Sequence, residues 1–502
     1  MTSHNGFNFT VNVLERLARE RGQDEALRAI DASDAVRSFT FAEVADRAAR
    51  VAGGLAALGV GRGDVIMTLM GARAEWVFAM LGAWRLGAVT LPCSEQLRAK
   101  DIMLRFDAAH PRVVLAAGRD LEALSAALER VEDKPAVRNV DAGELPDGEP
   151  GDAAATGLED PALMIFTSGT AAEPRGVLHV HRYLRGQAVQ AEHWFGPRAG
   201  ELAWCTAASG WSKSARNAFV APWTMGAACL LHEGRFDPAE RMAILAEQRV
   251  NVLCQSPTEY RMIAAGTSLD QGRLPDLRRL VSAGEPLNPE VIGVFDAALG
   301  LSIHDGYGQT ETGQLTGMPA GEAVRPGSMG KPLPGFDLRV LDEEGTPTQD
   351  GELAVDPATV PTFFHGYVGY DPFADPLWRT GDRVRRDEDG YLWFEGRLDD
   401  VILSAGYRIG PFEVESALVE HPAVAEAAAV GYPDYKRGSV VRAVVVLGED
   451  YEPSVKLAAE LQDHVKELTA PYKYPRIVEF REELPKTSSG KIKRAEIRAA
   501  WS

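Results

Sequence analysis

Short apolar runs separated by helical stretches recur through roughly the first 300 residues and limit the folds this chain can adopt. A continuous apolar run of this length is typical of a strand that is buried on both faces. Strands of that kind occur in parallel sheets whose two faces are covered by helices. The sequence therefore predicts an α/β fold, with strands in the runs Val65–Met70, Val113–Ala116, Leu163–Phe166 and Val250–Cys254.

One helix start is visible in the N-terminal part. Thr40 followed by Glu43 fits a capping box, in which each side chain accepts a free backbone N–H of the other residue. The apolar residues that follow share one helical face and Gly59 offers a stop; they are Val44, Val51, Leu55 and Leu58. The stretch Asp141–Asp160 is rich in Pro, Gly and acidic residues and predicts a surface loop.

The pattern of expected secondary structure changes twice in the second half of the sequence. From about Gly335, strand-like segments alternate with turns, which predicts a small β-rich subdomain with strands near Asp337–Leu341, Gly351–Val355 and Tyr391–Phe394. After Gly396 a segment of about a hundred residues has its own strands and helices, enough for an independent domain. It contains strand-like Ala427–Val430 and Val440–Val446, and one helical face of Leu457, Leu461, Val465 and Leu468. We therefore predict a large N-terminal domain over 1–398 and a small mobile α+β domain over 399–502.

Charge and cysteine content exclude several classes of protein. The chain has 53 basic and 72 acidic residues, a net charge of −19, which argues against a general nucleic-acid binder. Its four cysteines show no CxxC spacing, so neither a zinc site nor a redox pair is indicated. The start of the chain lacks the apolar core of a signal peptide, and no apolar run reaches the ~18 residues of a spanning helix. We expect a cytoplasmic enzyme without membrane insertion.

Three segments carry residues suited to a phosphorylated ligand. Hydroxyls, a glycine and a basic residue follow the strand Leu163–Phe166, namely Thr167, Ser168, Gly169, Thr170 and Arg175. Next comes Asp305-Gly306-Tyr307-Gly308-Gln309-Thr310-Glu311, whose glycines allow a close approach and whose glutamate is an oxygen ligand of the type Mg²⁺ prefers. The turn Gly284-Glu285-Pro286 precedes it. Taken singly, each is also compatible with an ordinary turn.

Three further segments complete the pattern. Asp382 and Arg397 end two strand-like runs, where a carboxylate and a guanidinium together suit a ribose diol or form a surface ion pair. The segment Ser404–Gly410 follows, and a glycine-hinged loop then presents Lys491. From Lys466 to the end, basic residues outnumber acidic ones, so this small domain can bring positive charge to a phosphorylated ligand.

These segments, in this order and spacing, resemble the adenylate-forming superfamily of AMP-binding enzymes and acyl-CoA synthetases over nearly the whole chain. The resemblance is greatest to the medium-chain acyl-CoA synthetases. It rests on shared local features: Gly210-Trp211, Ala221-Pro222-Trp223, Tyr260-Arg261-Met262, Gly308–Gly313, Gly406–Pro411 and Thr469–Arg476.

The resemblance implies a two-step reaction. A carboxylate attacks the α-phosphate of ATP, and the thiol of coenzyme A then attacks the acyl carbon and releases AMP. It places Thr167–Arg175 on the phosphates, Gly284–Pro286 and Asp305–Gln309 along ATP, and Asp382 and Arg397 on the ribose. The catalytic residues that it implies are Thr310, Glu311 and Lys491. Thr310 would lie along the α-phosphate, Glu311 would hold Mg²⁺, and Lys491 would stabilise charge at the α-phosphate.

The second step requires a second arrangement of the same site. In the family the small domain reorients about a hinge, which matches Asp399 here. The residues that would then contact coenzyme A are Ala405, Gly406, Tyr407, Arg408, Arg437, Lys466, Tyr474, Pro475 and Arg476. The resemblance also makes Lys491 a candidate for protein acetyltransferases, and it leaves open a homodimer.

The sequence departs from the family in two places. Ala171, Ala172 and Arg175 replace a hydroxyl residue, a glycine and a lysine of the phosphate loop, which predicts weaker or slower handling of ATP. Trp211 matches the position of an aromatic residue that gates the acyl pocket in the family. The alternative is that Trp211 is simply a tryptophan of the hydrophobic core. Ser212, Lys213 and Ser214 follow where other members are often more apolar, and we expect Lys213 to face solvent.

Three functions are compatible with these residues. The first is an AMP-forming ligase that joins coenzyme A to a medium-chain, branched or aromatic acid. The second is an adenylating enzyme that loads a carrier protein or another nucleophile. The third is a nucleotide or carboxylate sensor without turnover. Arg437, Lys466 and Arg476 favour free coenzyme A, whose 3′-phosphate a carrier arm lacks.

Overall fold

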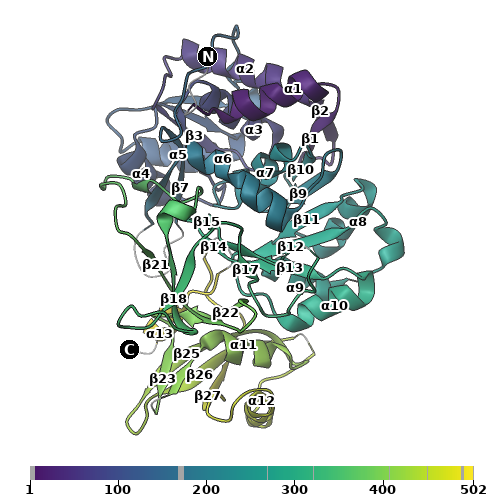
Figure 1. The fold of residues 1–502 in the computed structure, drawn as a ribbon, viewed down its shortest axis with the longest axis vertical. Helices are drawn as coiled ribbons and strands as arrows, with labels where there is room; N and C mark the ends of the chain where they lie inside the picture. Colours follow the sequence, from purple (N-terminus) through teal and green to yellow (C-terminus); the bar gives the residue numbers. More distant parts are fainter. Residues whose placement is uncertain are drawn as a thin grey trace.

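The computed structural model describes residues 6–167, 174–267, 269–319, 321–405, 407–448, 450–487 and 491–500. It has the predicted α/β fold. Two seven-stranded sheets with their helices form the upper and middle parts, a smaller β-sheet lies beside them, and the C-terminal domain is at the lower end (Figure 1). Within the described residues, no helix combines the length and apolar character needed to cross a membrane.

The first sheet contains three of the predicted strands. Its order is β20 (Gly366–Tyr367), β8 (Gly176–Val180), β7 (Pro161–Phe166), β4 (Val89–Cys93), β3 (Val65–Leu69), β5 (Val113–Ala116) and β6 (Ala136–Asn139). The strands from β7 to β6 run parallel, whereas β8 is antiparallel to both β7 and β20. The phosphate-loop segment joins β7 to β8.

The second sheet contains the fourth predicted strand. Its order is β13 (Ile303–Gly306), β12 (Arg279–Ala283), β11 (Val252–Gln255), β9 (Leu202–Cys205), β10 (Ala228–His232), β1 (Glu25–Ile30) and β2 (Val36–Thr40). Only β2 is antiparallel to its neighbour. The carboxyl ends of β11, β12 and β13 therefore meet at one edge, where open parallel sheets bind ligands.

Alternate residues of these strands pack on opposite faces of the second sheet. Leu253, Leu280 and Ile303 pack against α8 (Pro238–Glu247), α9 (Pro257–Gly266) and α10 (Pro289–Leu299). Val252 and Val281 pack on the other face, against η4 (Ala191–Phe195) and α7 (Ala221–Thr224). Burial on both faces explains why these strands read as continuous apolar runs.

The predicted capping box is confirmed. The helix α2 (Phe41–Ala57) begins after Thr40, whose side chain accepts the backbone N–H of Glu43 while Glu43 binds the backbone N–H of Thr40. The helix ends before Gly59, which has a φ of 79°. Other N-terminal helices are η1 (Thr10–Glu15), α1 (Arg16–Arg21), α3 (Ala74–Arg85), α4 (Ala99–Ala109), α5 (Leu121–Leu128), α6 (His181–Gln190) and η5 (Arg216–Val220).

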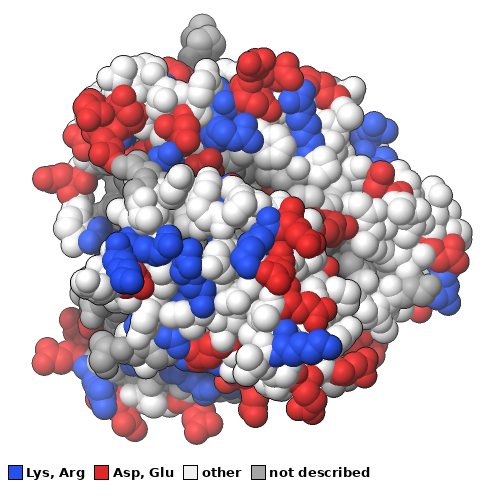
Figure 2. Space-filling model, turned by 90° about the horizontal axis from the view of Figure 1, so that it is seen from below, with Lys and Arg blue, Asp and Glu red and all other residues white. Residues whose placement is uncertain are grey.

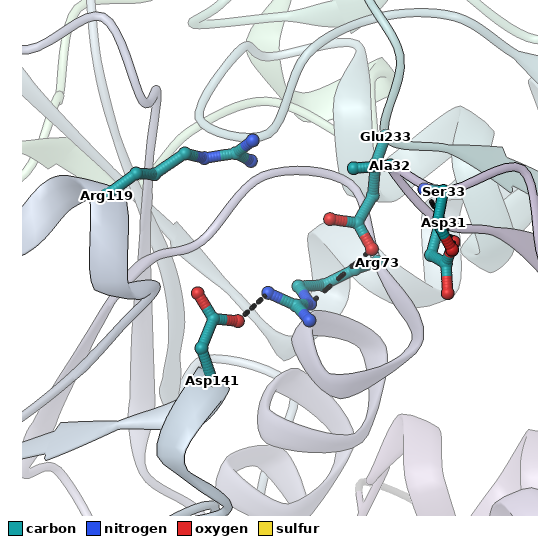
Figure 3. Close-up of a pocket in the computed structure, with 7 residues that line it drawn as sticks. All are labelled: Asp31, Ala32, Ser33, Arg73, Arg119, Asp141 and Glu233. Carbon is teal, nitrogen blue, oxygen red and sulfur yellow. Dashed lines mark hydrogen bonds and ion pairs between the residues drawn. The ribbon is translucent and has the colours of Figure 1, made fainter.

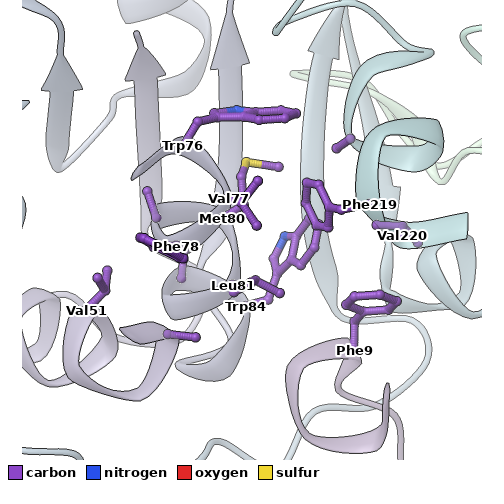
Figure 4. Packing of buried hydrophobic residues seen from close by; sticks show 14 of the residues in the cluster. Phe9, Val51, Trp76, Val77, Phe78, Met80, Leu81, Trp84, Phe219 and Val220 are labelled. Atoms are coloured by element: carbon purple, nitrogen blue, oxygen red, sulfur yellow. The ribbon is translucent and has the colours of Figure 1, made fainter. Parts of the chain in front are cut away.

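An aromatic core joins the two large sheets. Trp76 and Trp84 of α3 contact Phe219 of η5, with ring centroids 5.6 and 5.8 Å apart, and Phe9 meets Trp84 edge to face (Figure 4). Each of these rings is fully buried. Since large aromatic side chains contribute much of a core's burial energy, this cluster holds the two sheets in a fixed relation.

The predicted β-rich subdomain is a four-stranded antiparallel sheet. Its order is β18 (Leu338–Leu341), β19 (Asp350–Val355), β21 (Trp378–Arg386) and β22 (Leu392–Arg397). Two small hairpins connect it to the second large sheet. They are β14 (Gly308–Gln309) with β15 (Gly313–Gln314), and β16 (Thr316–Gly317) with β17 (Lys331–Pro332).

The C-terminal domain has its own sheet and core. The strands are β24 (Tyr407–Ile409), β23 (Ile402–Ser404), β26 (Gly438–Leu447), β25 (Val424–Asp434) and β27 (Ile477–Phe480), and the helices are α11 (Pro411–Val419), α12 (Val455–Leu468) and α13 (Arg494–Ala499). Leu457, Leu461 and Val465 of α12 are buried as predicted. Leu468 belongs to the helix as predicted, but as its last residue it is 48% exposed.

Candidate active site

The predicted ribose pair lies at the centre of a hydrogen-bond network. Asp382 and Arg397 are cross-strand partners in β21 and β22, and Arg397 Nη1 lies 3.3 Å from Asp382 Oδ1. The hydroxyl of Tyr307 and the Nε2 of Gln309 (2.9 Å) both donate to Asp382 Oδ2. Burial raises the pKa of Asp382, and Arg397 opposes that rise. The pair is therefore part of a built site and is no isolated surface ion pair.

Trp378 orients the amide of Gln309. Its Nε1 donates to Gln309 Oε1 at 2.8 Å, which fixes the amide so that its nitrogen faces Asp382. No local pattern in the sequence pointed to Trp378, because the contact links residues 69 positions apart.

Glu311 lies beside the base of the phosphate loop. Tyr367 of β20 donates its hydroxyl to Glu311 Oε1 at 2.8 Å, and the ring of Tyr367 faces the guanidinium of Arg175 at 5.4 Å. Arg175 and Thr167 pair through backbone and side chain, with Thr167 N 2.9 Å from Arg175 O. Sequence reasoning missed Tyr367. Ser168, Gly169, Thr170, Ala171 and Ala172 lie outside the described residues.

The turn after β12 adopts the conformation that its glycine permits. Gly284 has a φ of 103°, in the left-handed region that side chains disfavour. Glu285 Oε2 accepts a 2.7 Å hydrogen bond from Thr258 Oγ1 and lies 3.3 Å from Arg261. Pro286 completes the turn at the carboxyl end of β12.

Asp305 and Gly306 end β13 directly beside this turn, because Ser282 and Ala283 are their partners in β12. Asp305 is buried and its Oδ1 has no hydrogen-bond partner among the described residues. Burial raises the pKa of Asp305 well above its ordinary range, opposed by the N–H of Gly306 and by Lys213.

Lys213 does not face solvent, so that prediction was wrong. Its side chain is half-buried, and Nζ donates to the carbonyl of Ala283 at the end of β12. The turn that follows Trp211 directs it toward the sheet edge, which a local pattern of Ser and Lys could not reveal. Trp211 itself is partly buried against the apolar cluster that includes Cys205 and Ala207.

Lys491 reaches this site from the C-terminal domain. The residue keeps solvent exposure, but the protein crowded around its ammonium lowers the pKa by desolvation; Lys213 lowers it further, and the carboxylates of Glu285, Asp382 and Glu311 oppose the shift. The backbone of Lys491 is held by Thr487, which accepts its N–H on Oγ1 at 3.1 Å. The structure therefore brings Lys491 among the residues predicted to bind ATP.

Among the described residues predicted to contact coenzyme A, Tyr407, Arg437, Lys466, Tyr474 and Arg476 contact other residues of the C-terminal domain. Lys466 and Arg476 both lie over the ring of Tyr474, at 4.4 and 4.8 Å. Tyr407 stacks on Tyr472, and its strand β24 pairs with β23 at the lower end of the molecule (Figure 1). Ala405 N donates to the carbonyl of Arg437 at 2.9 Å. Gly406 and the side chain of Arg408 lie outside the described residues.

That end of the molecule carries a mixed charge. Seen from below, clusters of Lys and Arg lie between acidic groups (Figure 2).

The hinge candidate Asp399 lies 3.3 Å from Arg397 Nε, and the next residue, Asp400, pairs with Arg498 at 2.6 Å. The chain thus passes between the two domains through ion-paired residues.

A separate pocket of about 300 Å³ lies at the turn between β1 and β2 (Figure 3). Arg73, one of its two cations, already pairs with Asp141 at 2.6 Å and with Glu233 at 3.7 Å. The other, Arg119, pairs with Glu95. Nearby, ligand atoms of Asp34, His232 and Glu240 lie within 4.8 Å of one another. Neither group belongs to the site above.

Comparison with known proteins agrees with this geometry. Residues 14–368 match the family model "AMP-binding enzyme" and residues 413–491 match "AMP-binding enzyme C-terminal domain". The chain is 39% identical to acyl-CoA ligase YtcI of Bacillus subtilis (97% of this chain, 95% of that one). It is 38% identical to the mitochondrial acyl-coenzyme A synthetase ACSM3 of Mus musculus (98% and 90%).

A solved structure shares the whole fold. The anthranilate CoA ligase AuaEII in complex with anthranoyl-AMP superimposes with a TM-score of 0.90 at 29% identity, covering 99% of this chain and 98% of that one. The chain therefore belongs to the AMP-binding enzymes, and within them it is an acyl-CoA synthetase, an AMP-forming acid–thiol ligase.

Proposed function

We propose that the protein joins a carboxylic acid to coenzyme A in two steps that share one site. In the first, a carboxylate oxygen of the acid bonds to the α-phosphorus of ATP while the bond to pyrophosphate breaks. In the second, the sulfur of coenzyme A bonds to the acyl carbon, its proton passes to solvent, and AMP leaves with the electrons of the broken C–O bond.

The observation that carries this proposal is the position of Lys491. Its ammonium lies close enough to Glu285, Glu311 and Asp382 to be influenced by each of them. These carboxylates belong to the segments that we assign to ATP, together with Gly284, Pro286, Asp305–Thr310 and Arg397. A cation placed there offsets charge that builds up at the α-phosphate during adenylation.

A magnesium ion fits the oxygen donors present. Tyr367 binds only Oε1 of Glu311, and Oε2 has no hydrogen-bond partner within the described part of the chain. When bound, Mg²⁺ would neutralise phosphate charge. Arg175 and Thr167 at the loop base would bind the phosphates, and Tyr367 would orient Glu311.

The second step calls for a different placement of the small domain. Tyr407, Arg437, Lys466, Tyr474 and Arg476 contact other residues of the C-terminal domain in this arrangement. We propose that the domain 399–502 rotates about Asp399, withdraws Lys491 and brings Ala405–Arg408 and the basic residues to coenzyme A. Rotation would break the Arg397–Asp399 ion pair, which is half-exposed and therefore costs little to open.

We propose a medium-chain, branched or aromatic acid as substrate, with Trp211 at the acyl pocket. The anthranilate CoA ligase supports an aromatic acid, and the relative ACSM3 supports an acyl substrate. A cytoplasmic location, a homodimer and acetylation of Lys491 are kept as proposals from the sequence.

The test is release of AMP across a panel of acids, with and without coenzyme A. We expect release that depends on both. A matched control is Lys491→Ala, which should lose pyrophosphate release but still form thioester from supplied acyl-adenylate. AMP release indifferent to coenzyme A would contradict the proposal and favour a carrier protein or other acceptor. ATP binding in calorimetry without pyrophosphate release would favour a sensor.

A further inference from the structure

Buried polar atoms without partners gather beside the proposed ATP site. More than nine in ten buried polar groups in proteins are hydrogen-bonded, so such atoms call for an explanation. In the described part of the chain, several belong to residues around the carboxyl ends of β12 and β13 and the segment after Trp211: Tyr183, Ser212, Arg216, Ser282, Asp305 and Gln314. This side of the site is therefore polar.

Arg216 is the most unusual of these residues. It is 3% exposed, and its Nε and Nη1 have no hydrogen-bond partner among the described residues. No carboxylate in that part of the chain forms an ion pair with it. Its Nη1 lies 3.6 Å from the position that a Cβ on Gly313 would take, so the guanidinium points toward the turn that follows Glu311. Burying a charge without a counter-ion is strongly unfavourable in general, which argues against a purely structural role for this arginine.

Lys213 is a second cation on the same segment, three positions earlier. Asn217 N donates to its carbonyl at 3.3 Å, so the segment is already helical there and positions 213 and 216 lie on neighbouring parts of one face. The ammonium packs against Gly284, where a Cβ would lie 2.8 Å from Nζ, and donates to Ala283 O. Among the described residues no carboxylate lies within ion-pair distance of it. Asp305 is near enough to feel its charge, but burial disfavours the ionised form of that carboxyl.

The two cations follow the proposed acyl residue Trp211 in the sequence and contact glycines of the segments assigned to ATP. Trp211, the proposed acyl gate, is two residues before Lys213, and Gly284 and Gly313 border the nucleotide segments. The phosphates already have Arg175 and Lys491 in the proposed function. A further anion in this place would therefore belong to the acid.

We propose, on the premise of the proposed ligase activity, that Arg216 and Lys213 bind a second anionic group of the acid substrate. The substrate class is then a dicarboxylic acid, or an acid with another terminal anion such as a sulfonate. One carboxylate is adenylated and the second negative group lies against the two cations, where it supplies a counter-charge to both and hydrogen-bond acceptors to the Nε and Nη1 of Arg216. A planar guanidinium suits a carboxylate or sulfonate, because it donates two parallel hydrogen bonds.

The first experiment compares matched acids in pyrophosphate release by the full chain. The panel holds straight-chain monocarboxylates of four to eight carbons, the dicarboxylates of equal carbon number, and one acid with a terminal sulfonate. We expect kcat/KM to favour a dianionic acid over its monoanionic match by roughly 10- to 100-fold, the range of a hydrogen-bonded charge contact. The sulfonate then shows whether any anion suffices.

Variants test the residues themselves. Arg216→Leu and Lys213→Met should each lower kcat/KM for the dianionic acid. The kcat/KM for the monocarboxylate of equal carbon number should stay unchanged or rise. Arg216→Lys should retain part of the preference. Lys491→Ala is the control that lowers adenylation of every acid alike. Binding of ATP and the melting temperature show whether a variant is folded.

The outcomes separate the two proposals. A wild-type enzyme that adenylates only monocarboxylates, with selectivity unchanged in Lys213→Met and Arg216→Lys, overturns this inference and leaves the ligase function standing. Absence of pyrophosphate release with every acid tested would instead count against the proposed function. If Arg216→Leu does not fold, the wild-type selectivity together with Lys213→Met and Arg216→Lys decides the question.

Discussion

Tyr367 and Glu311 are joined by a 2.8 Å hydrogen bond from the tyrosine hydroxyl to Oε1 of the glutamate. The same tyrosine ring faces the guanidinium of Arg175 at 5.4 Å. One side chain therefore connects the proposed metal ligand to the proposed phosphate loop. The glutamate and the burial of the ring both raise the pKa of Tyr367, so its hydroxyl keeps the proton that it donates.

Removing this hydroxyl should impair ATP handling. Tyr367→Phe leaves the ring under Arg175 but frees Glu311, and a hydrogen bond to a charged group contributes about 1.5–3 kcal/mol. We expect the KM for MgATP to rise about tenfold in a pyrophosphate-release assay. Tyr370→Phe is the matched control, because Tyr370 also lies near Arg175, at 6.0 Å, and makes no hydrogen bond to Glu311. Equal effects of both variants would contradict the role of the hydroxyl.

The planar geometry of the Arg397 guanidinium should matter more for ATP binding than its positive charge does. Its Nη1 donates both to Thr380 O at 3.1 Å and to Asp382 Oδ1 at 3.3 Å, which a lysine cannot reproduce in one plane. We expect Arg397→Lys to raise the KM for ATP about tenfold with a small change in melting temperature. Arg379→Lys, on the neighbouring strand β21 and paired with Glu352, should leave the KM unchanged.

Arg175→Lys should have a modest effect in spite of the unusual phosphate loop. Lysine restores the residue that the family usually has, and it keeps the charge, but it loses the planar stacking on Tyr367 and Tyr370. We expect pyrophosphate release to stay within about tenfold of the parent. An inactive parent that the lysine variant rescues would show that this departure disables the loop.

The contact between the two domains contains a titrating pair. Glu290 of α10 faces Glu420 at the end of α11, and burial together with that second carboxylate raises the pKa of Glu290 to about 7. A raised carboxyl pKa means that this arrangement binds the proton more tightly than the separated domains do. Its stabilisation is present below about 4.5, the ordinary value, and is lost as the pH rises toward 7.

Glu290→Gln should remove this pH dependence. The amide stays neutral, so the melting temperature of the variant should exceed that of the parent increasingly between pH 5 and pH 7. Since both residues remain partly open to solvent, which screens their interaction, the gain is about 1 kcal/mol or less. Glu344→Gln, in an exposed turn, serves as the control for a lost charge elsewhere. A constant difference at every pH would contradict the proposed pairing.

Much of the fold could be predicted because its signals are local. Apolar runs in the sequence predicted the strands β3, β5, β7 and β11, and the Thr40–Glu43 capping box predicted the start of α2. Backbone periodicity and side-chain capping act over a few residues, so the sequence displays them directly. The exposed Leu468 shows the limit of this reasoning, since a helical pattern does not say where the supporting sheet ends.

The site required a different kind of information. Motif chemistry identified Asp382, Arg397, Glu311 and Lys491, and the structure brings these four residues to one place. Tyr367 and Trp378 had no local signature, because their contacts join segments 56 and 69 positions apart. Which residues meet across such separations depends on strand order and domain placement.

By itself, then, the sequence determined an α/β chain of two domains with the residues of an adenylating enzyme. Only the tertiary structure decided which charges have partners. The residues around Lys213 in the sequence predicted that it faces solvent, yet the edge of the second sheet holds it beside Gly284. The core encloses Arg216, and no described carboxylate pairs with it. Burial and pairing depend on all the elements that surround a side chain, and those elements come from distant parts of the chain.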